Sequence, residues 1–225
     1  MKVTIDADYY GDRKKKCYHP LYKKSEVDLL PGVTVLVGCN GSGKTTFLKQ
    51  LKDFCKAENI PILAYNNREN DGGRDLGKAV LNGDYNLAGE LFISSEGEKI
   101  NTNFSNHTTE IGKFFAENRY QDDIVITADA VDSGLSIDHM ISIKEDLFPL
   151  IIEDNSYRNV YIVIATNAYE FARHENCLDI TNLEYRTFVD YEDYRNFIIE
   201  SRKYKNKRYH WEPYKVEISQ TLSSS

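Results

Sequence analysis

The chain has 225 residues, a net charge of −7 and a hydrophobic fraction of 41%, which is enough apolar material for one substantial core. No stretch approaches the ~20 uninterrupted apolar residues of a membrane-spanning helix, and the first residues have no apolar core like that of a secretory signal. We therefore expect a cytoplasmic protein with a single domain over 1–225 and no membrane partner, and the negative charge argues against a surface that is coated throughout by nucleic acid.

The first third of the chain predicts strands that alternate with a helix. A strand is expected over 3–5, and the apolar, β-branched run 33–37 has glycine on both sides, which suits a buried strand. The next run, 45–56, has its apolar residues on one face and predicts a helix. Residues 60–65 predict the next strand.

The remainder continues the alternation after a weakly periodic stretch over 66–106. We expect, in chain order, short helices near 76–81 and 85–92, a helix over 110–119, a strand over 124–127, a helix over 139–153, a strand over 160–165, a short helix, a hairpin over 177–188 and a helix over 191–204. This order predicts an α/β fold with a mainly parallel sheet flanked by helices. Ligands of such folds bind beyond the carboxyl ends of the strands.

The segment from Gly38 to Thr45 reads Gly-Cys-Asn-Gly-Ser-Gly-Lys-Thr and fits the phosphate-loop pattern G-x-x-x-x-G-K-[ST]. Its glycines let successive backbone N–H groups point at one anion, and the following helix adds its positive end. Lys44 can reach the β- and γ-phosphates, and the Thr45 hydroxyl can ligate magnesium. The residues expected to contact ATP are Gly38, Asn40, Gly41, Ser42, Gly43, Lys44, Thr45 and Thr46.

A magnesium-binding carboxylate is expected at the end of another apolar strand. The run 124–128 is such a strand and leads directly into Asp129. We therefore assign Asp129, with Thr45, to the magnesium ion.

The phosphate loop and three later segments resemble the ABC-type ATPases, including the soluble branch related to SMC and RecF proteins. Residues 94–98 (Ser-Ser-Glu-Gly-Glu) resemble a degenerate signature motif, residues 129–136 resemble the magnesium-binding acid and D-loop, and residues 163–167 resemble the switch strand. The small size is similar to the short AAA family ATPases of phage and bacterial genomes. The resemblance implies a P-loop NTPase with a reduced helical and signature region at about 66–120, and a hairpin plus helix at about 175–210.

The resemblance also implies a mode of assembly. In this family two nucleotide domains pack head to tail, and the signature of each contacts the γ-phosphate bound by the other. Ser95 and Gly97 would act in this way, so a homodimer in the ATP state is expected, switching a protein partner.

Three polar positions depart from the family pattern. Ala130 stands where the family has its catalytic glutamate, and Asn167 replaces the switch histidine, so neither position can carry a proton. No convincing glutamine loop follows the strand over 60–65, although Asn66 or Asn67 could take its place. Hydrolysis is then either slow or served by another acid, of which Asp132 is the nearest, and Lys44, Asp132 and Asn167 are the candidate catalytic residues.

The resemblance implies an aromatic partner for adenine about 20 to 30 residues before the lysine. Tyr18 and Tyr22 both lie in that window, and an aromatic ring there could stack on the base. Tyr18 is our candidate.

Two other functions fit parts of the sequence. A P-loop kinase would share the loop, and an ATP-gated DNA clamp could use a basic cluster near the end of the last helix: Arg202, Lys203, Lys205, Lys207 and Arg208. A transporter subunit does not fit, because the segment between the loop and the signature is too short for the helical subdomain that contacts membrane partners. The cysteines, Cys17, Cys39, Cys55 and Cys177, show no paired spacing and predict free thiols.

Overall fold

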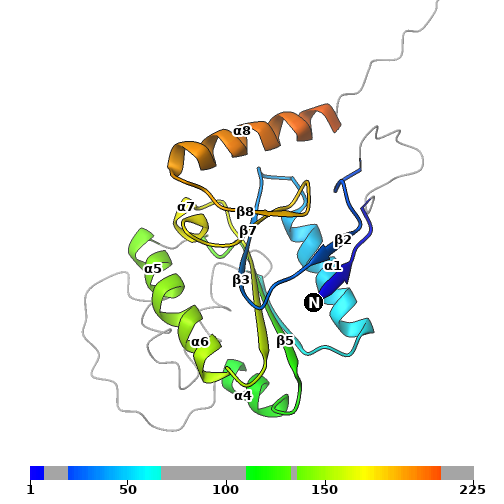
Figure 1. Cartoon of the computed structure of the whole chain (residues 1–225), viewed down its shortest axis with the longest axis vertical. Helices are drawn as coiled ribbons and strands as arrows, with labels where there is room; N and C mark the ends of the chain where they lie inside the picture. The colour runs from blue at the N-terminus through cyan, green and yellow to red at the C-terminus, as the bar shows by residue number, and fades with distance from the viewer. Residues whose placement is uncertain (8–19, 67–109, 133–135, 209–225) are drawn as a thin grey trace, which may run out of the picture.

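Six strands form one sheet in the order β4-β5-β6-β3-β7-β8. The computed structural model describes residues 1–7, 20–66, 110–132 and 136–208 (Figure 1), so the helices expected near 76–81 and 85–92 lie outside the described residues. The strands are β3 (Gly32–Val37), β4 (Ile62–Asn66), β5 (Asp123–Asp129), β6 (Asn159–Ala165), β7 (Cys177–Asp179) and β8 (Glu184–Arg186). All pairs are parallel except β7 with β8. The predicted α/β class with a mainly parallel sheet is confirmed.

The register of the central strands aligns their carboxyl ends. Ala165 of β6 lies opposite Leu36 of β3 on one side and opposite Asp129 of β5 on the other. The strand that leads into Asn167 therefore lies between the strand that leads into the phosphate loop and the strand that ends in Asp129. Three segments far apart in the sequence meet at one edge of the sheet.

Alternate residues of each central strand point to opposite faces, and each face has its own core. Val35 and Val37 belong to one core with residues of α5 (Ile137–Ser142) and α6 (Phe148–Asp154). Leu36 belongs to the other core, with residues of α1 (Lys44–Ala57), β1 (Lys2–Thr4) and β2 (Glu26–Asp28). Figure 1 shows α1 and the β1–β2 pair on one side of the sheet and α5 with α6 on the other. The helix α4 (Glu110–Glu117) adds Phe115 to the first core.

One strand, β2, was not expected from the sequence. Residues of β2 (Glu26–Asp28) pair antiparallel with β1 (Lys2–Thr4) in a separate two-stranded sheet. With three residues and one buried side chain, Val27, β2 is too short for its alternation to be read. β2 is a strand because it pairs with β1, and a contact between segments distant in the chain cannot be predicted from the residues of β2 alone.

The helix expected over 139–153 is interrupted. A π-helical segment, η1 (Ile143–Leu147), lies between α5 and α6, and the N–H of Phe148 donates to the carbonyl of Ile143. Pro149 is in the first turn of α6 and has no N–H. It therefore cannot donate the α-helical hydrogen bond to the carbonyl four residues earlier. The last helix, α8 (Tyr191–Arg208), extends four residues beyond the predicted end and lies across the end of the sheet near β7 and β8 (Figure 1).

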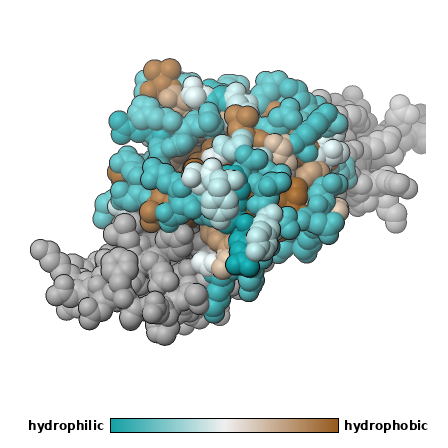
Figure 2. All heavy atoms as spheres, turned by 60° about the horizontal axis from the view of Figure 1, so that its bottom comes forward, coloured by the Kyte–Doolittle hydropathy of each residue, from teal (hydrophilic) through white to brown (hydrophobic). Residues whose placement is uncertain are grey.

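Apolar side chains are scattered over a mostly hydrophilic surface on the face drawn in Figure 2. Within the described ranges, no helix combines the length and the apolar character that crossing a membrane requires.

Candidate functional site

The phosphate loop connects β3 to α1, as its sequence pattern requires. Gly43 is the residue before α1 and has a φ of +112°, a conformation that glycine adopts without the penalty of a Cβ. A Cβ at this position would come within 3.0 Å of the Tyr22 ring and 3.1 Å of the Leu21 side chain. The close packing beneath Gly43 therefore also requires glycine here.

Tyr22 is the residue that supports the loop from below. Its side chain is completely buried, its hydroxyl donates to the carbonyl of Gly43 at 2.8 Å, and its ring meets Phe47 edge to face. A ring in this position cannot stack on a nucleotide base. Tyr18, the expected base partner, lies outside the described residues, as do Ser95 and Gly97 of the signature-like segment.

Lys44 is buried and directed into the site. Its ammonium donates to the carbonyl of Gly38 at 2.6 Å and to Oδ1 of Asn167 at 2.9 Å. The fold thus brings the loop lysine into contact with the residue at the switch position, 123 residues later. The carbonyl of Gly38 and the side-chain amide of Asn167 are neutral acceptors, and a lysine ammonium forms a stronger, charge-assisted hydrogen bond with a phosphate oxygen.

Asn167 is held on two further sides through its backbone. Its N–H donates to Oδ2 of Asp132 at 3.1 Å, and its carbonyl accepts from the hydroxyl of Tyr194 at 2.9 Å. Burial, with a smaller contribution from the Asp132 carboxylate, raises the pKa of Tyr194, so its hydroxyl stays a neutral donor. Asp132 therefore lies at the site, with one carboxylate oxygen engaged by the switch segment.

Asp129 meets the requirements for a magnesium ligand. It ends β5 with only 8% of its surface exposed, and its Oδ2 is buried without a hydrogen-bond partner. A buried carboxylate oxygen left without a donor is costly unless a cation completes it. Thr45 supplies a half-buried hydroxyl in the first turn of α1. Oxygen donors of this kind, few in number, suit magnesium, which takes its other ligands from phosphate and water.

The described part of the chain holds no group of three or more His, Cys, Asp or Glu side chains that could bind a metal by themselves. Ala130, directly after Asp129, is buried and has a φ of +55°, which is strained for a residue with a Cβ.

A cavity of about 410 Å³ opens beside the loop. Its lining comes from the loop, the switch position and α8: Cys39, Asn40, Asn167, Tyr191, Tyr194, Arg195, Ile198 and Ile199. The residues of α8 in this lining were not expected at the site from the sequence. The helical pattern of 191–204 predicts a helix but carries no information on what the helix covers.

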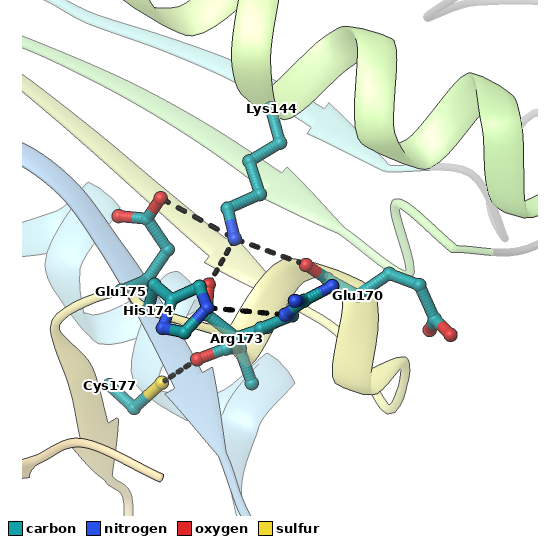
Figure 3. A network of polar contacts seen from close by, with 7 residues as sticks. Lys144, Glu170, Arg173, His174, Glu175 and Cys177 are labelled. Atoms are coloured by element: carbon teal, nitrogen blue, oxygen red, sulfur yellow. Dashed lines mark hydrogen bonds and ion pairs between the residues drawn. The ribbon is translucent and has the colours of Figure 1, made fainter. Parts of the chain in front are cut away.

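A second polar network anchors the segment that follows Asn167 (Figure 3). Lys144, from η1, donates to the carbonyls of Glu170 and Arg173 around the end of α7 (Tyr169–Ala172). Its ammonium also lies 3.7 Å from the carboxylate of Glu175. A cation near the last carbonyls of a helix is favourable, so η1 fixes the short helix that begins two residues after Asn167.

The basic cluster near the end of α8 is already partly engaged. Lys203 pairs with Glu200 at 2.5 Å, and Lys205 donates to the carbonyl of Asn40 at 2.8 Å. The ion pair offsets the charge of Lys203, whereas Lys205 keeps its charge in the contact with a neutral carbonyl. Cys39, Cys55 and Cys177 are free thiols, as predicted, and Cys17 lies outside the described residues.

The family of AAA ATPase domains matches residues 20–224. Among solved structures, a bacterial Atm1-family ABC exporter with ATP bound is similar with a TM-score of 0.45 and 14% identity over 91% of this chain. The Aeropyrum pernix ORC1 protein in complex with DNA has a TM-score of 0.32 and 17% identity over 78% of this chain. The alignments cover 41% and 44% of those chains, and no curated protein matches the sequence.

The family match covers nearly the whole chain and includes both the phosphate loop and the switch position. It confirms the resemblance read from the motifs at the level of a P-loop ATPase of this kind. The chain belongs to the AAA ATPase domain family and is an ATP-binding P-loop ATPase domain.

Proposed function

We propose that this domain is a slow, ATP-dependent switch that binds ATP with magnesium and closes a head-to-tail homodimer, which then acts on a protein partner. The observation that carries the proposal is the 2.9 Å contact between the Lys44 ammonium and the Asn167 side chain. It joins the residue that binds the phosphates to the residue that senses the terminal phosphate, and it must rearrange when the nucleotide enters.

Each contact at the loop suggests one part of the binding step. The Lys44 ammonium exchanges the carbonyl of Gly38 for phosphate oxygens, since a charge-assisted bond to an anion is stronger than one to a neutral carbonyl. The Asn167 amide can then donate to the terminal phosphate through its NH₂ group. Asp129 and Thr45 would hold magnesium, which supplies charge neutralisation at the phosphates when bound.

Slow turnover follows from the residues beside Asp129. Ala130 has no group that could orient or deprotonate a water molecule, and Asn167 cannot carry a proton. The nearest carboxylate, Asp132, accepts the N–H of Asn167 at 3.1 Å. It would have to weaken this contact to act as a base, so we expect ATP to persist long enough to work as a signal.

Dimer closure is the remaining part of the proposal. The chain carries one phosphate loop and one signature-like segment, with Ser95 and Gly97 as its candidate contacts. If these contacts are made across two chains, two complete sites require two copies of the chain. ATP would then be bound between the copies, and its hydrolysis would release them.

The test combines light scattering with ATP turnover. Wild type should be monomeric without nucleotide and dimeric at saturating ATP and magnesium, with slow phosphate release. Lys44→Ala should lose both the dimer and the turnover. Lys49→Ala is the matched control, because Lys49 is an exposed lysine of the same helix, and it should behave as wild type. A wild-type protein that stays monomeric at saturating ATP contradicts the dimer.

A further inference from the structure

We propose that Lys205, from α8, is a second phosphate-binding cation that contacts the terminal phosphate of ATP, so that α8 forms part of the nucleotide site. This inference rests on the ATP binding at the phosphate loop. It adds a residue that lies 161 positions after Lys44 and outside every motif of the loop.

The contact between Lys205 and the loop is direct. The ammonium donates to the carbonyl of Asn40 at 2.8 Å, and the side chain lies along Gly41. A Cβ at Gly41 would meet Nζ of Lys205 at 3.0 Å and Cε at 3.2 Å. Glycine at this position therefore gives the lysine room to approach the loop backbone.

The rest of α8 holds Lys205 in place. One turn earlier, the buried Ser201 accepts the N–H of Cys39 through its hydroxyl at 3.1 Å. Near the start of the helix, Tyr194 donates to the carbonyl of Asn167 at 2.9 Å. The helix thus contacts the loop at two points and the switch position at a third, and Lys205 is presented by a fixed element.

The position of Asn40 places Lys205 at the terminal-phosphate end of the site. Asn40 and Asn167 line the same cavity, and Asn167 accepts a hydrogen bond from Lys44. The loop lysine of P-loop proteins reaches the β- and γ-phosphates. A cation at the carbonyl of Asn40 therefore lies closer to the γ-phosphate than to the nucleoside.

The neighbouring lysine shows what is specific to Lys205. Lys203 is on the same helix but forms an ion pair with Glu200, whereas Lys205 contacts a neutral carbonyl of the loop. A lysine side chain has a flexible stem with a compact charge at its end, so the ammonium can turn from this carbonyl to a phosphate oxygen. The triphosphate, with the larger charge, gains more from this contact than the diphosphate.

The experiment is calorimetric titration of ATP and of ADP, each with magnesium, into wild type, Lys205→Ala, Lys205→Arg and the control Lys203→Ala. Lys205→Ala should weaken ATP binding about tenfold and ADP binding by less than about threefold. Lys205→Arg keeps the charge and should retain most of the affinity, and Lys203→Ala should bind ATP as wild type does. Added salt should weaken ATP binding less in Lys205→Ala than in wild type, because one charge contact is missing.

The inference is overturned if folded Lys205→Ala binds ATP with wild-type affinity. It is also overturned if the substitution lowers the affinities for ATP and for ADP by the same factor. An equal loss in Lys203→Ala also overturns it, because the effect would then be the general charge of α8. Wild type that binds no ATP refutes nucleotide binding itself. If wild type binds ATP but never dimerises, only the proposed dimer is refuted. The affinities of the Lys205 variants for ATP and ADP then still test the role of Lys205.

Discussion

Removal of one hydroxyl group, in Tyr22→Phe, tests how the core supports the phosphate loop. The hydroxyl donates to the carbonyl of Gly43 at 2.8 Å, and the same carbonyl accepts the N–H of Phe47 at 2.8 Å. The carbonyl therefore keeps a partner in the variant, and the loss should equal one net hydrogen bond, about 1 kcal/mol of unfolding free energy. For a domain of this size that corresponds to a melting temperature lower by about 2–4 °C.

Tyr22→Ala gives the contrasting result. The ring is completely buried and packs on Phe47, so its removal leaves a cavity and should cost about 3–5 kcal/mol. Urea denaturation followed by circular dichroism measures the unfolding free energy of both variants. The dependence of this free energy on urea concentration should stay unchanged. Tyr120→Phe is the control, because Tyr120 is 84% exposed. The reasoning is refuted if Tyr22→Phe is as stable as wild type or as unstable as Tyr22→Ala.

Three further outcomes are expected in urea denaturation. Ala130→Gly should raise the unfolding free energy by about 1 kcal/mol, because it relieves the φ of +55°, and a lower urea midpoint would contradict this. Lys144→Met should lower the unfolding free energy by about 2 kcal/mol, because the carbonyls around the end of α7 lose a charged donor. Lys113→Met is the control and should change the unfolding free energy little, because Lys113 is exposed. Burial raises the pKa of the Cys55 and Cys177 thiols from 9.0 to about 12. Since the fold disfavours the ionised thiols, their contribution to stability is complete below pH 9 and is lost as the pH rises towards 12. The urea concentration at the unfolding midpoint should therefore be lower at pH 10.5 than at pH 8, and an equal midpoint at the two pH values would contradict this assignment.

Local patterns were enough to predict the elements around the phosphate loop. The strand before it, the loop itself and the helix after it depend on contiguous residues, namely β-branched runs, glycines and helical periodicity. The run ending at Asp129 was predicted as a strand for the same reason, and β5 confirms it. The π-helical turn η1 was not predicted, because periodicity cannot separate it from the α-helix on either side.

The roles of the two tyrosines show the limit of this approach. Distance along the chain made Tyr22 as suitable for base stacking as Tyr18. The structure buries Tyr22 under Gly43, because β1, β2 and α1 close over it as one core. Burial depends on elements remote in sequence, and 16 tyrosines in one chain cannot be separated by spacing alone.

The sequence by itself determined that this chain binds a nucleoside triphosphate, because the backbone nest and its lysine are encoded in eight consecutive residues. Tertiary structure alone decided what surrounds that nest. The strand order placed Asn167 against Lys44 and paired the end of β6, Ala165, with Asp129, and the packing of α8 brought Lys205 to the loop. The contacts of Lys44 with Asn167 and of Asn40 with Lys205 join residues 123 and 165 positions apart, so they depend on which strands pair and which helix covers their ends.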